Sequence, residues 1–373
     1  MQYAALATVK HRLRVGAPLP FNVRNADKTL LLARGQQVDT DGQLQALFDR
    51  GALVDLSELI SPREEVLRAP REALPRLWGR CMGQVAQALQ NAPHPGFREA
   101  LDEVSTPVLA LVERDPDLAI FQVLRQGANE DVAYGVRRSM QSAITAFLVA
   151  QRLAWEPAQV ERVFKVALTM NISMLELQGQ LARQRTPPTA EQRALLATHP
   201  MRSVRILELS GVTDAAWLHA VLSHHETEDG SGYPSGRSDV GELASLARRA
   251  DLYTSKLASR STRDALAADV AGREMFMQDP GHPMTAALVK EFGIYPPGCH
   301  VRLASGELGI VVARGETITS PVVACLTDAA GMPLARPVRR DTAERAHAVT
   351  GIVGASEVPQ RVSVEQIVAA LDA

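Results

Sequence analysis

Between about Arg71 and Gly293, apolar residues recur at steps of three and four, the spacing of an amphipathic helix. The first such stripe comprises Leu74, Leu77, Trp78, Met82, Val85 and Leu89. Amphipathic helices bury their apolar stripes against one another, so the region is expected to form a helical bundle.

Helix-start signals divide this region. Asp115-Pro116-Asp117 places a capping carboxylate ahead of a proline at the first helical position. Thr189-Ala190-Glu191-Gln192 reads as a capping box, and Thr213-Asp214 opens a further helix. These last two helices are expected to carry His199 and to end at His224.

The pattern changes to strands on both sides of the helices. Pro18–Val23 and Thr29–Ala33 flank a turn-prone segment and predict a hairpin, followed by a short helix from Asp41 to Arg50. At the other end, Val301–Leu303 and Leu308–Val312 predict a second hairpin. Beyond it we expect a strand at Val322–Leu326 and a short helix from Val362 to Leu371.

We therefore expect an α+β chain, a mainly α-helical core flanked by small β-rich modules. The expected N-terminal module is 1–65, the helical region 66–295 with its core at about 130–295, and the C-terminal module 296–373. A length of 373 residues accommodates two or three domains.

The net charge and the cysteine pattern limit the possible binding partners and cellular compartments of the protein. The 42 acidic and 40 basic residues give a net charge of −2, which leaves no electrostatic footprint for duplex nucleic acid or anionic membrane. Cys81, Cys299 and Cys325 are scattered, as expected of ordinary thiols in a reducing compartment. No stretch approaches the ~20 apolar residues of a membrane span, and a cytoplasmic protein is expected.

Residues 224–234 read His-His-Glu-Thr-Glu-Asp-Gly-Ser-Gly-Tyr-Pro. Imidazole and carboxylate bind borderline divalent metals such as Fe, Mn or Zn. Gly230 and Gly232 let the backbone approach a ligand closely, and Tyr233 adds a face on which a base can stack. The run predicts a phosphoester site; the alternative is an ordinary surface loop after a helix.

This run resembles the signature HHExxDGxGYP of the HD-GYP family, bacterial metal-dependent phosphodiesterases that open cyclic di-GMP. The resemblance implies an HD-type helical bundle and metal ligands at His224 and His225. It also implies a nucleotide-binding turn made of Asp229, Gly230, Gly232, Tyr233 and Pro234.

Two further matches lie elsewhere in the helices. His199-Pro200 fits a later histidine of the family, and Ala250-Asp251 fits its Ala-Asp pair. The implied ligands of a divalent metal such as Fe or Mn are therefore His199, His224, His225 and Asp251. Taken alone, His199 is more simply a helix histidine and Asp251 a surface carboxylate. The order of the motifs favours a ligand role for His199 and leaves Asp251 open.

The pair that gives the family its name is missing. Residues 167–174 stand where the family has A-L-L-H-D-I-G-K, so Met170 replaces the histidine, Asn171 the aspartate and Met174 the lysine. An amide cannot neutralise two cations as a bridging carboxylate does, and a thioether is a poor ligand for such metals. A two-metal site is not expected, although one ion can still be held weakly. The Met and Val spacing here is that of core packing.

Three arginines suggest another way to hold phosphate. Arg260 and Arg263 lie where the family is arginine-rich, and Arg138 stands in place of an early histidine. Guanidinium groups clamp phosphates, but the simpler interpretation is solvated helix residues. Arg138 is expected inside, paired with Asp251 or Glu226, because an unpaired buried charge is costly.

Two functions follow from the resemblance. The first is a degenerate regulator in cyclic di-GMP signalling, inactive or weak, that binds the nucleotide or a partner such as a diguanylate cyclase domain. The alternative is an active phosphodiesterase that produces linear pGpG with a metal at the retained ligands. Loss of both residues of the HD pair favours the first, because catalysis requires a metal-activated water.

Overall fold

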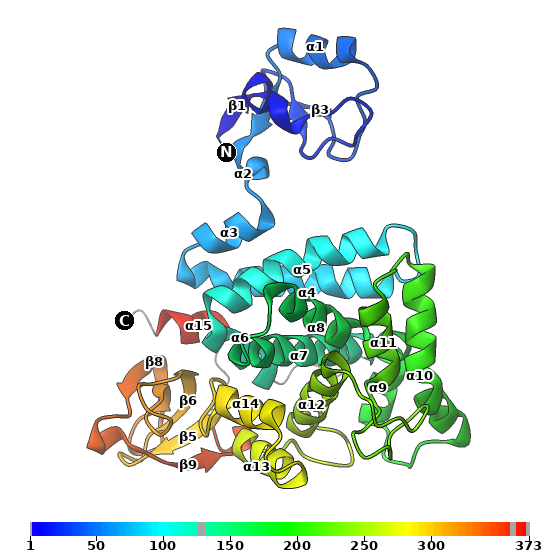
Figure 1. Cartoon of the computed structure of the whole chain (residues 1–373). Helices are drawn as coiled ribbons and strands as arrows, with labels where there is room; N and C mark the ends of the chain where they lie inside the picture. Colours follow the sequence, from blue (N-terminus) through cyan, green and yellow to red (C-terminus); the bar gives the residue numbers. More distant parts are fainter. Residues whose placement is uncertain (1, 126–130, 359–362, 371–373) are drawn as a thin grey trace. The chain divides into compact units, whose positions relative to one another are not determined.

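The computed structural model describes residues 2–125, 131–358 and 363–370. The chain divides into two units, Met1–Ala69 and Pro70–Ala373, and Figure 1 labels most of their helices and strands. Many helices and two small antiparallel sheets confirm the expected α+β class. The three-part division expected from the sequence stays a prediction.

The first unit is built on an antiparallel sheet with strand order β1-β4-β2-β3. Its elements are β1 (Tyr3–Ala5), η1 (Leu6–Arg12), β2 (Val23–Arg24), β3 (Leu30–Leu32), α1 (Asp41–Asp49), β4 (Leu53–Asp55), α2 (Leu56–Leu59) and α3 (Pro62–Arg68). Phe21, Val23 and Val54 are almost fully buried in its core. The predicted hairpin is confirmed as β2 and β3, and the predicted helix as α1.

The second unit begins with helices. They are η2 (Arg71–Ala73), α4 (Leu74–Gln90), α5 (Phe97–Arg114), α6 (Pro116–Leu124), α7 (Asp131–Arg152), α8 (Pro157–Thr169), η3 (Ile172–Met174), α9 (Leu175–Arg183), α10 (Ala190–Leu209), α11 (Ala215–Ser223), α12 (Glu242–Leu257), α13 (Ala268–Gln278) and α14 (Pro283–Phe292). The three predicted starts are confirmed. The side chains of Asp115 and Asp214 cap α6 and α11, and Thr189 with Gln192 forms the capping box of α10.

Helix α7 packs against α8, α9 and α12 (Figure 1). Every residue from 138 to 150 is buried, so this stretch has no solvent-facing side. Gly135 lies against the first turn of α9, where an added Cβ would come within 2.2 Å of the Leu175 carbonyl oxygen. The close approach requires glycine, and it sets the position of the α7 turn that follows.

The second unit ends in a five-stranded antiparallel sheet with the order β8-β7-β6-β5-β9. Its elements are β5 (His300–Leu303), β6 (Leu308–Ala313), β7 (Val322–Thr327), β8 (Pro333–Asp341), η4 (Arg345–His347), β9 (Val349–Val353), η5 (Ala355–Glu357) and α15 (Val364–Ala369). The predicted strands are confirmed as β5, β6 and β7, and the predicted helix as α15. Val362 and Leu371, the expected ends of that helix, lie outside the described residues.

Ion pairs join this sheet to the helices. Arg314, just after β6, contacts Asp117 of α6 and Glu291 of α14, and Arg152 of α7 contacts the same glutamate. Leu124 of α6 packs against the apolar core of the sheet. The helices and the sheet therefore share both an ionic and an apolar interface.

Two compositional expectations can be checked directly. In the described ranges, no helix combines the length and the apolar character that a membrane crossing requires. All three cysteines are free thiols in buried positions, as their scattered spacing predicted.

Replacing Gly135 by alanine should destabilise the protein by about 1–3 kcal/mol, because the new methyl group collides with backbone rather than with a movable side chain. Urea unfolding of wild type and variant measures the difference. Gly79→Ala is the matched control: Gly79 lies exposed in α4 with nothing within 4 Å of its would-be Cβ. That change should stabilise by roughly 0.5–1 kcal/mol through helix propensity alone. Equal effects of the two changes would contradict the close approach of α7 and α9.

Candidate metal and nucleotide site

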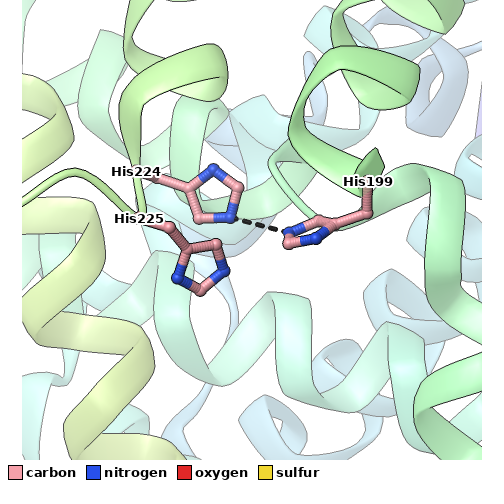
Figure 2. Close-up of side chains that lie close together, drawn as sticks. All are labelled: His199, His224 and His225. Atoms are coloured by element: carbon pink, nitrogen blue, oxygen red, sulfur yellow. Dashed lines mark hydrogen bonds between the residues drawn. The ribbon is translucent and has the colours of Figure 1, made fainter. Parts of the chain in front are cut away.

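Three histidines converge between α10 and α11. His199 lies within α10, His224 ends α11, and His225 follows directly. One ring nitrogen from each lies within 4.8 Å of the others, and Figure 2 shows the rings turned toward one another. His199 and His224 are fully buried and His225 is half-buried. The three residues predicted from separate parts of the chain are thus brought together.

Hydrogen bonds fix which ring nitrogens of His199 and His224 face the cluster. The two Nδ1 atoms lie 2.6 Å from main-chain carbonyl oxygens, of Leu196 and Val221 respectively. A carbonyl oxygen only accepts, so each Nδ1 carries the proton and each neutral ring presents a lone pair at Nε2. The two Nε2 atoms are 3.1 Å apart (Figure 2). Two acceptors therefore face each other, and a cation between them would remove the repulsion.

All three rings are held in the neutral form. Burial, and then the neighbouring His225 and His199, hold the pKa of His224 well below its usual value. Burial also lowers the pKa of His199, and burial with His199 and Arg248 lowers the pKa of His225 to about 3. Near pH 7 the imidazoles are in the state that binds metals.

The spacing fits one divalent ion. Imidazole nitrogens lie about 2.0–2.1 Å from a bound zinc ion, which places two such ligands roughly 3 Å apart. The observed 3.1 Å between the Nε2 atoms of His199 and His224 agrees with that spacing. Both rings also donate their other N–H to a carbonyl, the arrangement that orients histidine ligands.

A tight turn after the histidines is fixed by Glu226. Its buried carboxylate accepts hydrogen bonds from the backbone N–H groups of Ser235 (2.6 Å) and Arg237 (3.1 Å). Gly232 lies so close to the preceding backbone that an added Cβ would be 2.4 Å from the carbonyl oxygen of His225. Any side chain at this position would force the turn apart.

Asp229 stabilises the same turn through hydrogen bonds to its carboxylate. Its carboxylate accepts from the Thr227 hydroxyl at 2.6 Å and from the Ser231 backbone N–H at 3.0 Å. These hydrogen bonds lower the pKa of Asp229 to about 2. Gly230 follows with φ of 74°, in the left-handed region that favours glycine. Both residues shape the turn, and their role in ligand binding stays a prediction.

Tyr233 lies on the histidine cluster. Its ring stacks on His225 with centroids 4.6 Å apart and an interplanar angle of 13°. The residue is 36% exposed, so part of the ring remains open to a ligand. The peptide bond to Pro234 is cis. The predicted aromatic surface is therefore continuous with the predicted metal ligands.

Asp251 is hydrogen-bonded to side chains of α7. Arg138 donates from Nη2 to Asp251 Oδ1 at 2.9 Å, and the Ser142 hydroxyl donates to the same oxygen at 3.2 Å. Of the two partners expected for Arg138, the structure gives Asp251 and not Glu226. A metal role for Asp251 stays a prediction.

The positions of the missing pair are filled by core residues. Met170 and Asn171 are almost completely buried, and Met174 is 8% exposed. Val163 and Val166 are also fully buried, which confirms the expected core stripe. Within the described part of the chain, Asn171 Oδ1 has no hydrogen-bond partner, so an amide oxygen is left unsatisfied where the resemblance predicts a carboxylate.

Arg260 and Arg263 lie beyond α12 and are exposed. The Arg260 N–H donates to the Arg263 carbonyl at 2.8 Å, and both guanidinium groups donate to Ser255. Burial, and then the charges of these two arginines among others, lowers the pKa of Arg138, so they lie within electrostatic range of it. Phosphate binding by Arg260 and Arg263 stays a prediction.

Comparison with known proteins assigns the region that holds all these residues. Residues 122–269 match the family described as HD domain. This segment is thus similar to an HD domain, in line with the resemblance predicted from the motifs. It is 27% identical over 231 residues to the cyclic di-GMP phosphodiesterase PA4108 of Pseudomonas aeruginosa, a match over 60% of this chain and 54% of that protein. The chain thus spans about half the length of that relative.

A solved structure supports the fold of the HD domain and its surroundings. Bd1817, a HDG"Y"P protein from Bdellovibrio bacteriovorus, aligns with a TM-score of 0.50 over 78% of this chain and 98% of its own. At 16% sequence identity this likeness concerns the fold alone.

An ion-pair network beneath the turn of the HD domain was missed by sequence reasoning. Arg249, 2% exposed, donates to Glu228 at 2.9 Å and also contacts Asp279, while the Ser245 hydroxyl donates to Glu228 at 2.6 Å. The turn that carries Tyr233 is thereby tied to α12 and to the loop before α14. The sequence signal for this network is the adjacent pair Arg248-Arg249 in a largely apolar helical stretch.

Glu228→Gln should loosen this network in a pH-dependent way. Burial would raise the pKa of Glu228, but hydrogen bonds from Ser245 and Arg249 outweigh it and lower the pKa to about 2. The carboxylate therefore stabilises the fold fully above its ordinary pKa of 4.5, and the stabilisation is lost as the pH falls toward 2. The variant should lose about 1 kcal/mol at pH 7 after solvent screening.

Urea unfolding at pH 7 and pH 4 measures this difference. The gap between wild type and Glu228→Gln should shrink at the lower pH. Glu316→Gln, at an exposed glutamate after β6, is the control and should leave stability unchanged at both values. A gap for Glu228→Gln that widens on acidification would refute the assigned hydrogen bonds.

Proposed function

We propose that this chain acts in cyclic di-GMP signalling by binding one divalent ion at His199, His224 and His225 and the dinucleotide at the adjoining turn, with weak hydrolysis or none. Similarity to a cyclic di-GMP phosphodiesterase supports the choice of ligand. The observation that carries the metal is the 3.1 Å approach of the Nε2 atoms of His199 and His224, whose Nδ1 atoms already donate to carbonyl oxygens. Without a cation, that arrangement is electrostatically unfavourable.

The turn supplies the surface for the nucleotide. The Tyr233 ring is partly exposed and held in place by His225, so it offers a fixed face for a guanine base. A bound divalent ion would act as a Lewis acid toward a phosphodiester oxygen. The glycine-rich backbone beside it allows the phosphate to approach closely.

The side chains around the cluster argue against efficient hydrolysis. A two-metal phosphodiesterase holds the attacking and leaving oxygens with two ions and needs carboxylates to neutralise them. Here Asn171 provides an amide, Met170 a thioether, and the carboxylate of Asp251 is paired with Arg138. Binding with little turnover is the function that these residues favour.

Hydrolysis to linear pGpG is the second candidate. Three imidazoles with an open position resemble the ligand set of single-metal hydrolytic sites. Such a site has one ion to activate water and none to stabilise the leaving oxygen, so any turnover would be slow.

Metal binding is the first test. Purified protein titrated anaerobically with Fe²⁺ or Mn²⁺ and assayed by elemental analysis should hold about one ion per chain, the number that three converging imidazoles can ligate. His224→Ala should abolish retention after gel filtration. His219→Ala, an exposed histidine on the same helix α11, should retain it. Equal metal content in the two variants would exclude the histidine cluster as the site.

Nucleotide binding is the second test, by calorimetry with cyclic di-GMP on the metal-loaded protein. Tyr233→Ala should weaken binding by about 1–3 kcal/mol through loss of a stacked base, whereas Tyr233→Phe keeps the ring and should bind like wild type. If both variants bind as wild type does, the turn is not the binding surface.

The same samples, followed by chromatography for linear product, separate the two candidate functions. Product above that of His224→Ala would favour the phosphodiesterase.

A further inference from the structure

Arg138 is almost completely buried, with 3% of its side chain exposed. Its Nη2 donates both to the carboxylate of Asp251 at 2.9 Å and to the carbonyl oxygen of the same residue at 3.0 Å. The Ser142 hydroxyl adds a third hydrogen bond to that residue. Asp251 is therefore fixed from the α7 side by two neighbouring turns of one buried helix.

The same carboxylate, fixed by Arg138 and Ser142, lies within electrostatic range of the histidine cluster. Its charge acts to raise the pKa values of His199 and His224 against the larger effect of burial, and it also acts on Tyr233. A carboxylate at that place is the natural charge partner for a cation held by the imidazoles. Here the carboxylate of Asp251 is paired instead with the guanidinium group of Arg138, which stays protonated.

Stability alone does not account for the pair. A buried ion pair is often no more stabilising than apolar residues of the same volume. The Arg138 guanidinium also has a buried Nη1 with no hydrogen-bond partner among the described residues, which is unfavourable. The Arg138–Asp251 ion pair is thus present although one nitrogen of the guanidinium group lacks a hydrogen-bond partner among the described residues.

We propose that Arg138 is a specificity-determining residue: a built-in cation that withholds Asp251 from the histidine cluster, so that the cluster takes a single divalent ion ligated by imidazoles alone. This inference rests on the proposed metal site. The guanidinium occupies the carboxylate that would otherwise help to hold that ion or a second one.

The arrangement changes the net charge of the site. Three neutral imidazoles and a carboxylate already paired with arginine leave both positive charges of a divalent ion uncompensated. If the carboxylate of Asp251 ligated the ion, the net charge of the ion and its ligands would be lower by one. The free positive charge favours an anionic oxygen, such as that of a phosphodiester, as the remaining ligand.

A double-mutant cycle tests the proposal, with Mn²⁺ affinity by calorimetry as the readout. Asp251→Asn should leave the affinity within about threefold of wild type, because that carboxylate does not ligate the ion. Arg138→Met, which keeps the bulk and removes the charge, should tighten binding by about tenfold or raise the number of ions bound, because Asp251 becomes free. The double variant should return to the wild-type affinity.

Arg138→Lys is the matched control, since it keeps the positive charge and should keep the wild-type affinity. Thermal unfolding verifies that each variant is folded. If Arg138→Met does not fold, Arg138→Gln replaces it with a polar side chain of similar length.

Two results would overturn the proposal. One is a tenfold or larger weakening by Asp251→Asn while Arg138 is present, which would make Asp251 a ligand. The other is unchanged Mn²⁺ binding in a folded Arg138→Met or Arg138→Gln protein. If wild type binds no Mn²⁺ but Arg138→Met does, the proposed function fails while the role of Arg138 stands. If neither binds, both fail.

Discussion

The burial of α7 is the constraint on which the second unit depends. Residues 138–150 are all buried, so a charged or amide side chain there is costly without a partner within the protein. Arg138 finds Asp251 on α12, and the Gln141 amide donates to the carbonyl of Val123 at the end of α6. The hydrogen bonds of one helix thereby fix the placement of the helices around it, including the one that faces the histidines.

The site has two parts: one contains the histidines and the turn after them, and the other contains the positions where the HD pair is missing. His199 lies in the middle of α10, whereas His224, His225 and the turn after them follow the end of α11. The layer contributed by α8 and η3 is mainly apolar, with Val166, Met170 and Met174 buried in it. Methionine fills irregular space well, so this layer supports the fold without ligating anything. The fold does not require the ligands that are absent.

Much of this was predictable because it is local. A capping box such as Thr189 with Gln192 is a short-range signal, and the sequence located it correctly. Strand β8 was missed because its PLARPVRRD sequence is mostly exposed and has no apolar alternation. The long-range contacts were harder: a motif indicated that His199 and His224 belong together, but only the structure gives the direction of their ring nitrogens. The network of Arg249 had no motif at all.

The ion pairs of Arg314 connect elements that lie before and after the segment matched to the HD domain. Its partners Asp117 and Glu291, like Arg314 itself, lie outside residues 122–269, whereas Leu124 lies inside and packs into the core of the sheet. The segment that matches the HD domain is thus smaller than the set of elements that pack together around it. A chain cut to the matched segment would lose the neighbours that cover its own apolar residues.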